Sequence, residues 1–369
     1  MRPYRIIISG GGTGGHIFPA ISIANTFRQR HPDAAILFVG ADDRMEMERV
    51  PKAGYEITGL PISGLDRSNK LKNIAVLFRF LKSLYMAKKI VRTYAPDLIV
   101  GVGGYASAPT LWVASSLGVP TLIQEQNSYA GVTNKWLGKR AAKICVAYEG
   151  MDRFFSAEKI VLTGNPVRKE LEERLEDRKD ALDYFQLQPG KKTVLIIGGS
   201  LGARTINGGV RNGLKQLVDA GIQIIWQTGK YYYADIRRQL ECTDTKNPVW
   251  CADFITRMDY AYAAADLVVS RAGAGSVSEL CLLKKAAVLI PSPNVAEDHQ
   301  TKNALAVVNR GAAAMIADRD AEKLLADTIL SLIHDADKLK TFSEQIGLLA
   351  RRHSAELIVD EMEKLITKT

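Results

Sequence analysis

The stretch that decides the fold is Ile6-Ile7-Ile8-Ser9-Gly10-Gly11-Gly12-Thr13-Gly14-Gly15-His16, and the helical pattern of residues 19–28 follows it. Glycines let a backbone approach a phosphate or a sugar closely, and the following helix start supplies unpaired N–H groups and a partial positive charge. A single turn of this kind also serves tight packing of a helix on a strand, without any ligand. The stretch therefore predicts a strand, a loop and a helix, with the loop as a candidate anion site.

The same arrangement recurs twice, at residues 101–107 and at residues 198–204. Strand and helical patterns alternate along the chain, which is typical of βαβ units with parallel sheets. The predicted strands are Arg5–Ser9, Ala35–Val39, Leu98–Val102, Thr121–Gln124, Lys143–Val146, Thr193–Ile197, Gln223–Gln227, Leu267–Val269 and Ala287–Ile290. We expect an α/β fold of two Rossmann-like domains that face a cleft, with the glycine loops at the carboxyl ends of their strands.

The domain boundary is expected near Gly164-Asn165-Pro166, which a highly charged stretch follows. This gives an N-terminal domain at 1–164, a second domain at 165–345 and a C-terminal helix at 346–369. The helical pattern of residues 339–366 leaves open whether this helix packs on the second domain or crosses back to the first.

Composition excludes several classes of protein. The 369 residues are 47% hydrophobic and 24% charged, which rules out disorder and collagen-like or disulfide-scaffold folds. The four cysteines form no CxxC and no zinc-type spacing, so a reducing compartment is expected. The N-terminus shows no signal-peptide pattern, and glycines and prolines interrupt the charge-free stretch 98–124, so no membrane span is expected there.

The net charge of +9 lies entirely in the first half. Residues 1–164 hold 21 Lys+Arg and 12 Asp+Glu, whereas residues 165–369 hold 28 of each. Residues 67–96 carry eight basic side chains and no acid, among apolar and aromatic residues. A solvated helix face explains this pattern as well as a functional surface does. Among functional surfaces, an anionic membrane fits better than nucleic acid, because no nucleic-acid-binding motif accompanies the charge.

Three side chains could do chemistry at the predicted strand ends. His16 lies in the first turn after the first loop, where the helix N-terminus favours the neutral imidazole of a general base, although a cap or packing role is the common one. Glu125 follows a strand within Gln124-Glu125-Gln126-Asn127, and could be an ordinary loop acid. Glu279 could bind a ribose diol, or could complete a capping box with Ser276.

Two further patterns have the spacing of known ligand-binding motifs. Gly10-x-Gly12-x-x-Gly15 formally matches a dinucleotide fingerprint, but Asp42 comes one step too late after the second strand. Asp318-Arg319-Asp320 and Asp335-Ala336-Asp337 have the spacing of a metal-binding motif, yet both precede helical patterns and are expected to be N-caps. No metal site and no cofactor are therefore expected.

With these residues in place, the chain resembles the MurG family of bacterial N-acetylglucosaminyltransferases over essentially its full length. The matching motifs are Gly10–His16 with Pro19, Gly101–Ala106, Glu125-Gln126-Asn127 with Thr133-Asn134-Lys135, Gly164–Arg168, Gly198–Arg204, Ser270–Glu279, and Asp298-His299-Gln300 with Asn303-Ala304. Seven motifs in the same order are far more specific than one glycine loop.

The resemblance implies GT-B architecture and inverting, metal-independent transfer of N-acetylglucosamine from UDP-GlcNAc to the 4-hydroxyl of MurNAc in lipid I, which gives lipid II for peptidoglycan. It implies peripheral attachment to the cytoplasmic face of the bacterial inner membrane, an anionic surface as partner, and cell-wall synthesis proteins as candidate partners. It implies His16 as first choice of base and Glu125 as second.

The resemblance also implies the substrate contacts. Ile255 would bind uracil through its backbone and Glu279 the ribose, while Gln300 and Asn303 would bind the GlcNAc hydroxyls. The diphosphate would be bound by Ser200, with Arg204 nearby, and by the helix start Ala274, Gly275, Ser276, Val277, Ser278. Five residues would close over the donor or receive the acceptor (Thr13, Gly14, Gly15, Asn127 and Arg168), and Asn134 would be a further substrate contact.

Three alternatives share these features in part. A non-hydrolysing UDP-GlcNAc 2-epimerase has the same architecture and needs no membrane acceptor, another GT-B glycolipid glycosyltransferase would differ in acceptor, and a nucleotide-sensing scaffold would bind UDP-GlcNAc without releasing UDP.

Overall fold

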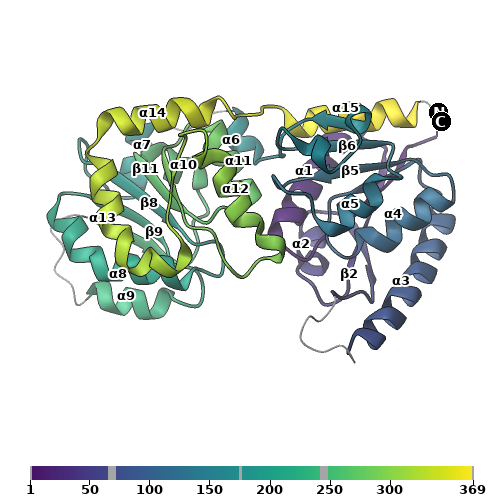
Figure 1. Cartoon of the computed structure of the whole chain (residues 1–369), viewed down its shortest axis with the longest axis horizontal. Coiled ribbons are helices and arrows are strands. Elements are labelled where there is room, and N and C mark those ends of the chain that lie inside the picture. Colours follow the sequence, from purple (N-terminus) through teal and green to yellow (C-terminus); the bar gives the residue numbers. More distant parts are fainter. Residues whose placement is uncertain (1, 65–71, 174–176, 242–247, 368–369) are drawn as a thin grey trace. The chain divides into compact units, whose positions relative to one another are not determined.

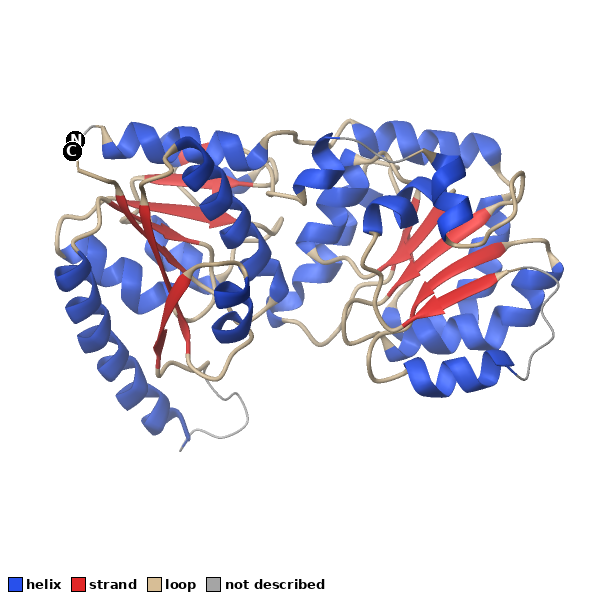
Figure 2. Ribbon diagram, turned by 180° about the vertical axis from the view of Figure 1, so that it is seen from behind, coloured by secondary structure: helices blue, strands red, loops and turns tan. Residues whose placement is uncertain are grey.

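The computed structural model describes residues 2–64, 72–173, 177–241 and 248–367. The chain forms two compact units, one of residues 1–167 and 353–369 and one of residues 168–352. Each unit is a parallel sheet with helices on both faces (Figures 1 and 2). The predicted α/β fold with two Rossmann-like domains is confirmed.

The sheet of the first unit has seven strands in the order β3-β2-β1-β4-β5-β6-β7. Consecutive isoleucines of β1 point to opposite faces, so Ile6 and Ile8 pack with α1 and α15, whereas Ile7 packs on the side of α3 and α4. The elements are β1 Arg5–Ser9, α1 Gly14–Arg30, β2 Ala35–Ala41, α2 Glu46–Lys52, β3 Glu56–Leu60, α3 Lys72–Tyr94, β4 Leu98–Gly101, α4 Ser107–Ser116, β5 Thr121–Glu125, α5 Val132–Gly138, β6 Lys143–Val146, β7 Ile160–Leu162 and α15 Ser354–Ile366.

The sheet of the second unit has six strands in the order β10-β9-β8-β11-β12-β13. Its core includes Trp226, which is fully buried beneath α8. The elements are α6 Lys169–Glu173, α7 Arg178–Tyr184, β8 Thr193–Ile197, α8 Arg204–Asp219, β9 Gln223–Gln227, α9 Tyr233–Glu241, β10 Val249–Ala252, α10 Met258–Ala264, β11 Leu267–Ser270, α11 Ala274–Leu282, β12 Ala287–Leu289, α12 His299–Val308, β13 Ala314–Met315, α13 Ala321–Ile333 and α14 Ala336–Gly347.

In both sheets the strand order reverses beside the first strand, between β1 and β4 and between β8 and β11. Open α/β sheets bind ligands at such a switch point, beyond the carboxyl ends of the strands. The three glycine loops follow β1, β4 and β8, so the structure places all of them at these points.

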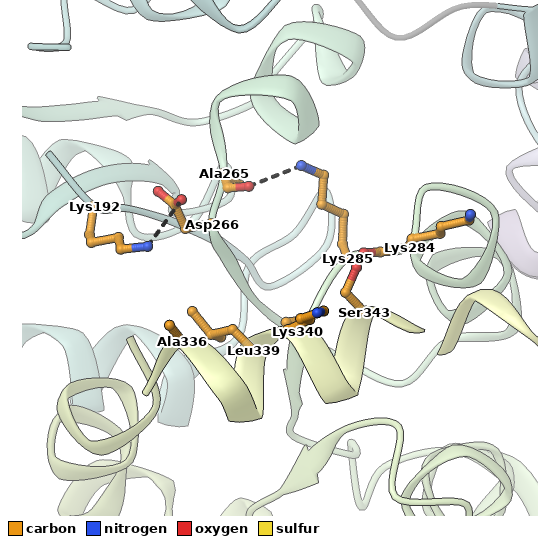
Figure 3. A pocket seen from close by; sticks show the side chains of 10 residues that line it. Lys192, Ala265, Asp266, Lys284, Lys285, Ala336, Leu339, Lys340 and Ser343 are labelled. Atoms are coloured by element: carbon orange, nitrogen blue, oxygen red, sulfur yellow. Dashed lines mark hydrogen bonds and ion pairs between the residues drawn. The ribbon is translucent and has the colours of Figure 1, made fainter. Parts of the chain in front are cut away.

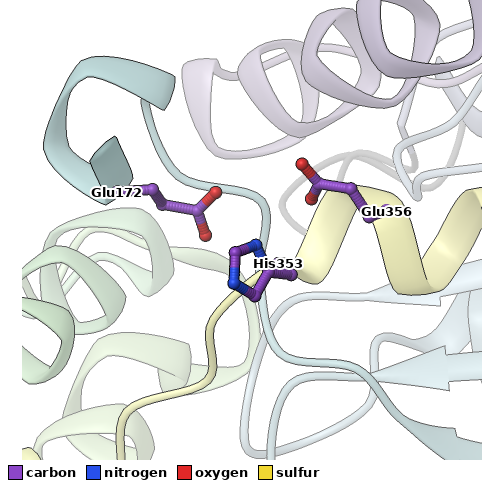
Figure 4. A group of neighbouring side chains, drawn as sticks. All are labelled: Glu172, His353 and Glu356. Atoms are coloured by element: carbon purple, nitrogen blue, oxygen red, sulfur yellow. The ribbon is translucent and has the colours of Figure 1, made fainter.

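The C-terminal helical pattern is two helices rather than one. Residue His353, with φ +56°, precedes α15, and Glu356 lies in its first turn (Figure 4). Helix α15 packs on α1 of the first unit, where Arg30 pairs with Asp360 at 2.6 Å and His31 contacts Glu363 at 2.8 Å. The chain therefore returns to the first unit at its end.

No helix among the described residues is both long enough and apolar enough to span a membrane.

Candidate active site

The first glycine loop is held by a buried acid. The Glu46 carboxylate accepts the Gly12 N–H at 2.8 Å and the Ala41 N–H at 3.1 Å, and Glu46 is only 1% exposed. Gly11 has φ +150°, and a Cβ there would lie 2.3 Å from the Glu46 carboxyl carbon. The loop also donates from Gly11 N–H to the carbonyl of Gly103 in the second glycine loop. Glu46 and the paired loops thus fix the backbone at the switch point.

His16 lies in the first turn of α1, as the sequence predicts. Its Nδ1 is 3.0 Å from the Gly11 carbonyl oxygen and 3.1 Å from Thr13 Oγ1. Because a carbonyl oxygen only accepts, Nδ1 carries the proton and Nε2 is the basic nitrogen. A Cβ on Gly103 would lie 3.0 Å from Nε2, so this nitrogen is directed over the second glycine loop.

Glu125 ends β5 and is buried, with four hydrogen bonds to its carboxylate. One oxygen accepts the main-chain and side-chain N–H groups of Asn127 at 3.0 and 3.3 Å, and the other accepts Gly131 N–H at 3.1 Å and Asn134 Nδ2 at 2.8 Å. The buried Asn134 Oδ1 has no hydrogen-bond donor among the described residues. Glu125 therefore holds the 127–134 loop in place and orients Asn134, whose Nδ2 lies near Gly103 and His16.

The predicted residues of the first unit lie together at one switch point. Thr13 is the N-cap residue of α1. Thr13 and Gly15 are exposed, and Gly14 is half-buried. Asn165 is buried and joins the 164–166 loop to the same region, because it accepts from Gln124 and donates to the Gln126 carbonyl, both at 2.9 Å.

The third glycine loop, at residues 198–203, opens α8 in the second unit. Ser200 and Arg204 are exposed, and Arg204 is the first residue of the helix, so a cation and unpaired N–H groups occur at one place. Gln227 braces this loop: its Nε2 donates to the Gly199 carbonyl at 3.1 Å and its Oε1 accepts the Ile255 N–H at 2.9 Å. Since the Ile255 N–H is paired, uracil binding there would use the carbonyl or displace Gln227.

Glu279 lies inside α11 rather than at its cap. The N-cap is Gly273, so the helix starts at Ala274 and the predicted capping box of Ser276 with Glu279 is wrong. Glu279 Oε2 accepts the hydroxyl of the fully buried Tyr262 at 2.8 Å, and Oε1 lies 3.5 Å from Arg168 Nε.

Burial sets the ionisation of this pair of side chains. Burial raises the pKa of Glu279, and the Arg168 guanidinium and the Tyr262 hydroxyl offset the rise in part. Burial and the Glu279 charge raise the pKa of Tyr262 well above its usual value, so Tyr262 is a permanent donor. Glu279 thus presents an oriented acceptor at the end of the second sheet, beside the partly buried N-terminus of α11.

The two remaining predicted donor residues lie on α12. Asn303 is fully buried and donates to the Ala272 carbonyl at 3.3 Å, which supports the loop before α11. Gln300 is half-buried, and its Oε1 accepts the Ser292 N–H at 2.9 Å.

Both acidic motifs supply the N-cap residue of a helix, as predicted, but only one of them caps through its side chain. Asp335 caps α14 through Lys338 N–H at 2.9 Å, as predicted. In the other motif, Asp320 occupies the N-cap position of α13, as predicted, but its side chain makes no capping hydrogen bond. Asp318 instead accepts from Thr205 at 2.6 Å and pairs with Arg271. Arg271 also donates to the Ile290 carbonyl at 3.0 Å, so this cluster ties α8 to the loops after β11 and β12.

Sequence reasoning missed three positioning residues: Glu46, Gln227 and Tyr262. Each lies outside the glycine motifs and acts through a backbone amide or another side chain. A signal existed only for Glu46, since a buried carboxylate needs partners and the loop amides need acceptors.

Comparisons with known proteins agree on one family. Residues 6–146 match the glycosyltransferase family 28 N-terminal domain, and residues 193–360 match the family's C-terminal domain. A protein of Parabacteroides distasonis named UDP-N-acetylglucosamine--N-acetylmuramyl-(pentapeptide) pyrophosphoryl-undecaprenol N-acetylglucosamine transferase is 65% identical over 100% of both chains. A Porphyromonas gingivalis protein of the same name is 57% identical, over 98% of this chain and 96% of its own. The crystal structure of Acinetobacter baumannii MurG has a TM-score of 0.79 at 28% identity, over 98% of this chain and 100% of its own.

Proposed function

Because the chain belongs to the MurG family of glycosyltransferases, we propose that it transfers N-acetylglucosamine from UDP-GlcNAc to the MurNAc 4-hydroxyl of lipid I, forming lipid II. The observation that carries the proposal is 65% identity, over the whole of both chains, to a relative whose name states this transfer. The two groups of polar residues at the switch points support it, since one suits a nucleotide diphosphate and the other a hydroxyl group.

The second unit would hold the donor. Glu279 would accept hydrogen bonds from the ribose diol, and its orientation by Tyr262 at 2.8 Å supports this role. The exposed Ser200 and Arg204 and the start of α11 (Ala274, Gly275, Ser276, Val277 and Ser278) would bind the diphosphate. As the bond to the sugar C1 breaks, negative charge develops on UDP, and these N–H groups and Arg204 would stabilise it without a metal ion.

The remaining donor contacts are proposed on the same unit. Ile255 would bind uracil, Gln300 and Asn303 would hold the GlcNAc hydroxyls, and Arg168 would exchange part of its contact with Glu279 for the substrate. Because Asn303 also supports the Ala272 carbonyl, it would shape the site in addition to contacting the sugar.

The first unit would hold the acceptor hydroxyl and remove its proton. His16 Nε2 is the proposed base, because Nδ1 is committed to the Gly11 carbonyl. Thr13, Gly14, Gly15 and Asn127 would contact substrate through the loop, while the unsatisfied Oδ1 of Asn134 would accept a substrate hydroxyl. Glu125 has all four contacts directed at its own loop, so we assign it a positioning role beside His16.

The surface of α3 supports attachment to an anionic membrane. Its exposed apolar residues Leu77, Phe78, Leu81 and Tyr85 are 52–73% exposed and share one helix face, opposite the buried Ser83, Ala87 and Val91. The cations Arg79, Lys82, Lys88, Lys89 and Arg92 are exposed around them, while Arg67 and Lys70 lie outside the described residues. A surface of this kind binds the headgroup boundary of a bilayer.

Such attachment would place the enzyme peripherally on the cytoplasmic face of the inner membrane, where cell-wall synthesis proteins are candidate partners. The surface would bring the acceptor-binding unit to a lipid-linked substrate.

The test of the proposed function is release of UDP from UDP-GlcNAc, with and without a lipid I analogue. We expect release only with the acceptor. Appearance of an epimer from UDP-GlcNAc alone would favour an epimerase, binding without release a sensing scaffold, and preference for another lipid acceptor a different glycolipid transferase.

A further inference from the structure

A polar pocket lies in the second unit, away from the proposed donor residues. It has a volume of about 280 Å³ and is lined by residues that precede β8, β11 and β12 and by one side of α14 (Figure 3). These strand ends are the amino ends of the sheet, whereas the glycine loops follow the carboxyl ends. The pocket is therefore separate from the donor site.

Lys285 is the innermost cation of the pocket. Its Nζ donates to the Ala265 carbonyl at 3.0 Å, and among the described residues no carboxylate forms an ion pair with it. Burial, reinforced by the Arg178 charge and partly offset by Asp266, lowers the pKa of Lys285 to about 8. An ammonium group in this setting gains from a further negative charge.

The one acid of the pocket is already committed. Asp266 accepts Arg178 Nη2 and the Thr193 N–H, both at 2.8 Å, and Lys192 Nζ is 3.7 Å from its other oxygen. The two positive charges of Arg178 and Lys192 thus exceed the single negative charge of Asp266, even without Lys285. The positive charge at this wall of the pocket is not neutralised by Asp266.

Helix α14 forms the opposite wall and supplies both a cation and apolar surface. The Lys340 side chain is 74% exposed, and its Nζ lies 3.9 Å from Glu344 Oε1, which is a long ion pair. Ala336 and Leu339 present aliphatic carbon to the pocket. Ser343 Oγ donates to the Lys284 carbonyl at 2.6 Å, so the helix is fastened to the turn that carries Lys285. Lys284 itself runs along the rim, away from the other amines (Figure 3).

The geometry points to a binding site for a small organic phosphate, with the phosphate held by Lys285, Lys192 and Lys340 and the carbon portion placed on Ala336 and Leu339. Charge-assisted N–H···O bonds to a phosphate are among the strong hydrogen bonds of proteins, and an aliphatic wall favours an organic ester over the bare ion. This ligand is distinct from both substrates and does not depend on the proposed reaction.

The binding test uses phenyl phosphate as the probe and the full chain saturated with UDP, so that the donor loops are occupied. Titration calorimetry at constant ionic strength is expected to show one saturable site, and Lys285→Met is expected to weaken it about tenfold or more, the loss of one charge-assisted contact. Lys323→Met, an exposed lysine on α13, is the matched control and should leave binding unchanged. Lys340→Met changes an exposed side chain and should also weaken binding. It tests the site even if Lys285→Met fails to fold.

Acetylation of individual lysines, mapped by mass spectrometry, locates the site. Phenyl phosphate should protect Lys285 from an acetylating reagent and leave Lys323 unprotected, and potassium chloride at equal ionic strength should protect neither. Sulfate, which stays doubly charged, should bind more weakly as pH rises above the pKa of Lys285, near 8. Three results would overturn the inference: no binding to the wild type, equal protection of Lys285 and Lys323, or unchanged affinity in both Lys285→Met and Lys340→Met.

Discussion

Replacing Glu46 by alanine should loosen the first glycine loop, because this carboxylate is the shared acceptor of two backbone N–H groups. The Ala41 N–H is buried and would lose its acceptor, at a cost of about 1–3 kcal/mol, while the exposed Gly12 N–H can turn to water. The buried γ-methylene that the substitution removes beside Gly40 adds about 0.8 kcal/mol. The expected loss in free energy of unfolding is therefore about 2–4 kcal/mol.

Glu46→Gln separates the charge from the packing. Glutamine keeps the side-chain volume, but its NH₂ group would face one of the two backbone N–H groups, so that two donors meet without an acceptor. We expect the free energy of unfolding to fall by about 1–3 kcal/mol. Both variants should also lower turnover, because the loop carries the His16 contact to Gly11.

Urea unfolding and hydrogen exchange at the Gly12 and Ala41 amides measure these effects. Glu48→Ala is the control, since Glu48 is on the same helix, is exposed, and pairs with Lys52 on the surface, where such pairs contribute about 0.3–0.5 kcal/mol. If Glu46→Ala unfolds within about 0.5 kcal/mol of the wild type, with both amides still protected, Glu46 does not hold the loop.

Four further predictions concern the site and the membrane. His16→Ala should lower kcat by about 10²–10⁴-fold and leave UDP affinity unchanged, which stopped-flow and calorimetry would check; normal turnover would remove His16 from the base role. Tyr262→Phe and Glu279→Ala should weaken UDP binding, the second by about 10–100-fold, and equal affinity to wild type by calorimetry would refute the ribose assignment. Since the pKa of Glu279 is raised and the ribose needs the carboxylate form, UDP affinity should fall with decreasing pH before the ordinary range of a glutamate is reached, and Glu279→Ala should remove that dependence. Phe78→Ser with Tyr85→Ser should reduce sedimentation with anionic liposomes, and retention equal to that of the wild type would leave α3 as an ordinary solvated helix.

The strand pattern was predictable because buried parallel strands are continuous apolar runs, as in Ile6–Ile8 and Val194–Ile197. Four strands escaped prediction: β3, β7, β10 and β13. These four are the edge strands of the two sheets, and β13 has only two residues. Because they are only partly buried, their sequences show a weaker apolar pattern.

The loops and His16 could be located from sequence because spacing alone places them at strand ends. The function of Glu125 within its loop could not, since it depends on which amides meet the carboxylate after folding. The capping box at Ser276 failed for a related reason: the helix begins at Ala274, and small residues allow several possible starts. Long-range partners such as Tyr262 for Glu279 require the packed structure.

The most direct measurement is the structure of the product formed from UDP-GlcNAc and a lipid I analogue, determined by NMR of the isolated glycolipid. The account predicts a β-linked N-acetylglucosamine on the 4-hydroxyl of MurNAc, formed in step with UDP release. An α linkage, a different acceptor hydroxyl, or free N-acetylglucosamine as the sole product would contradict it.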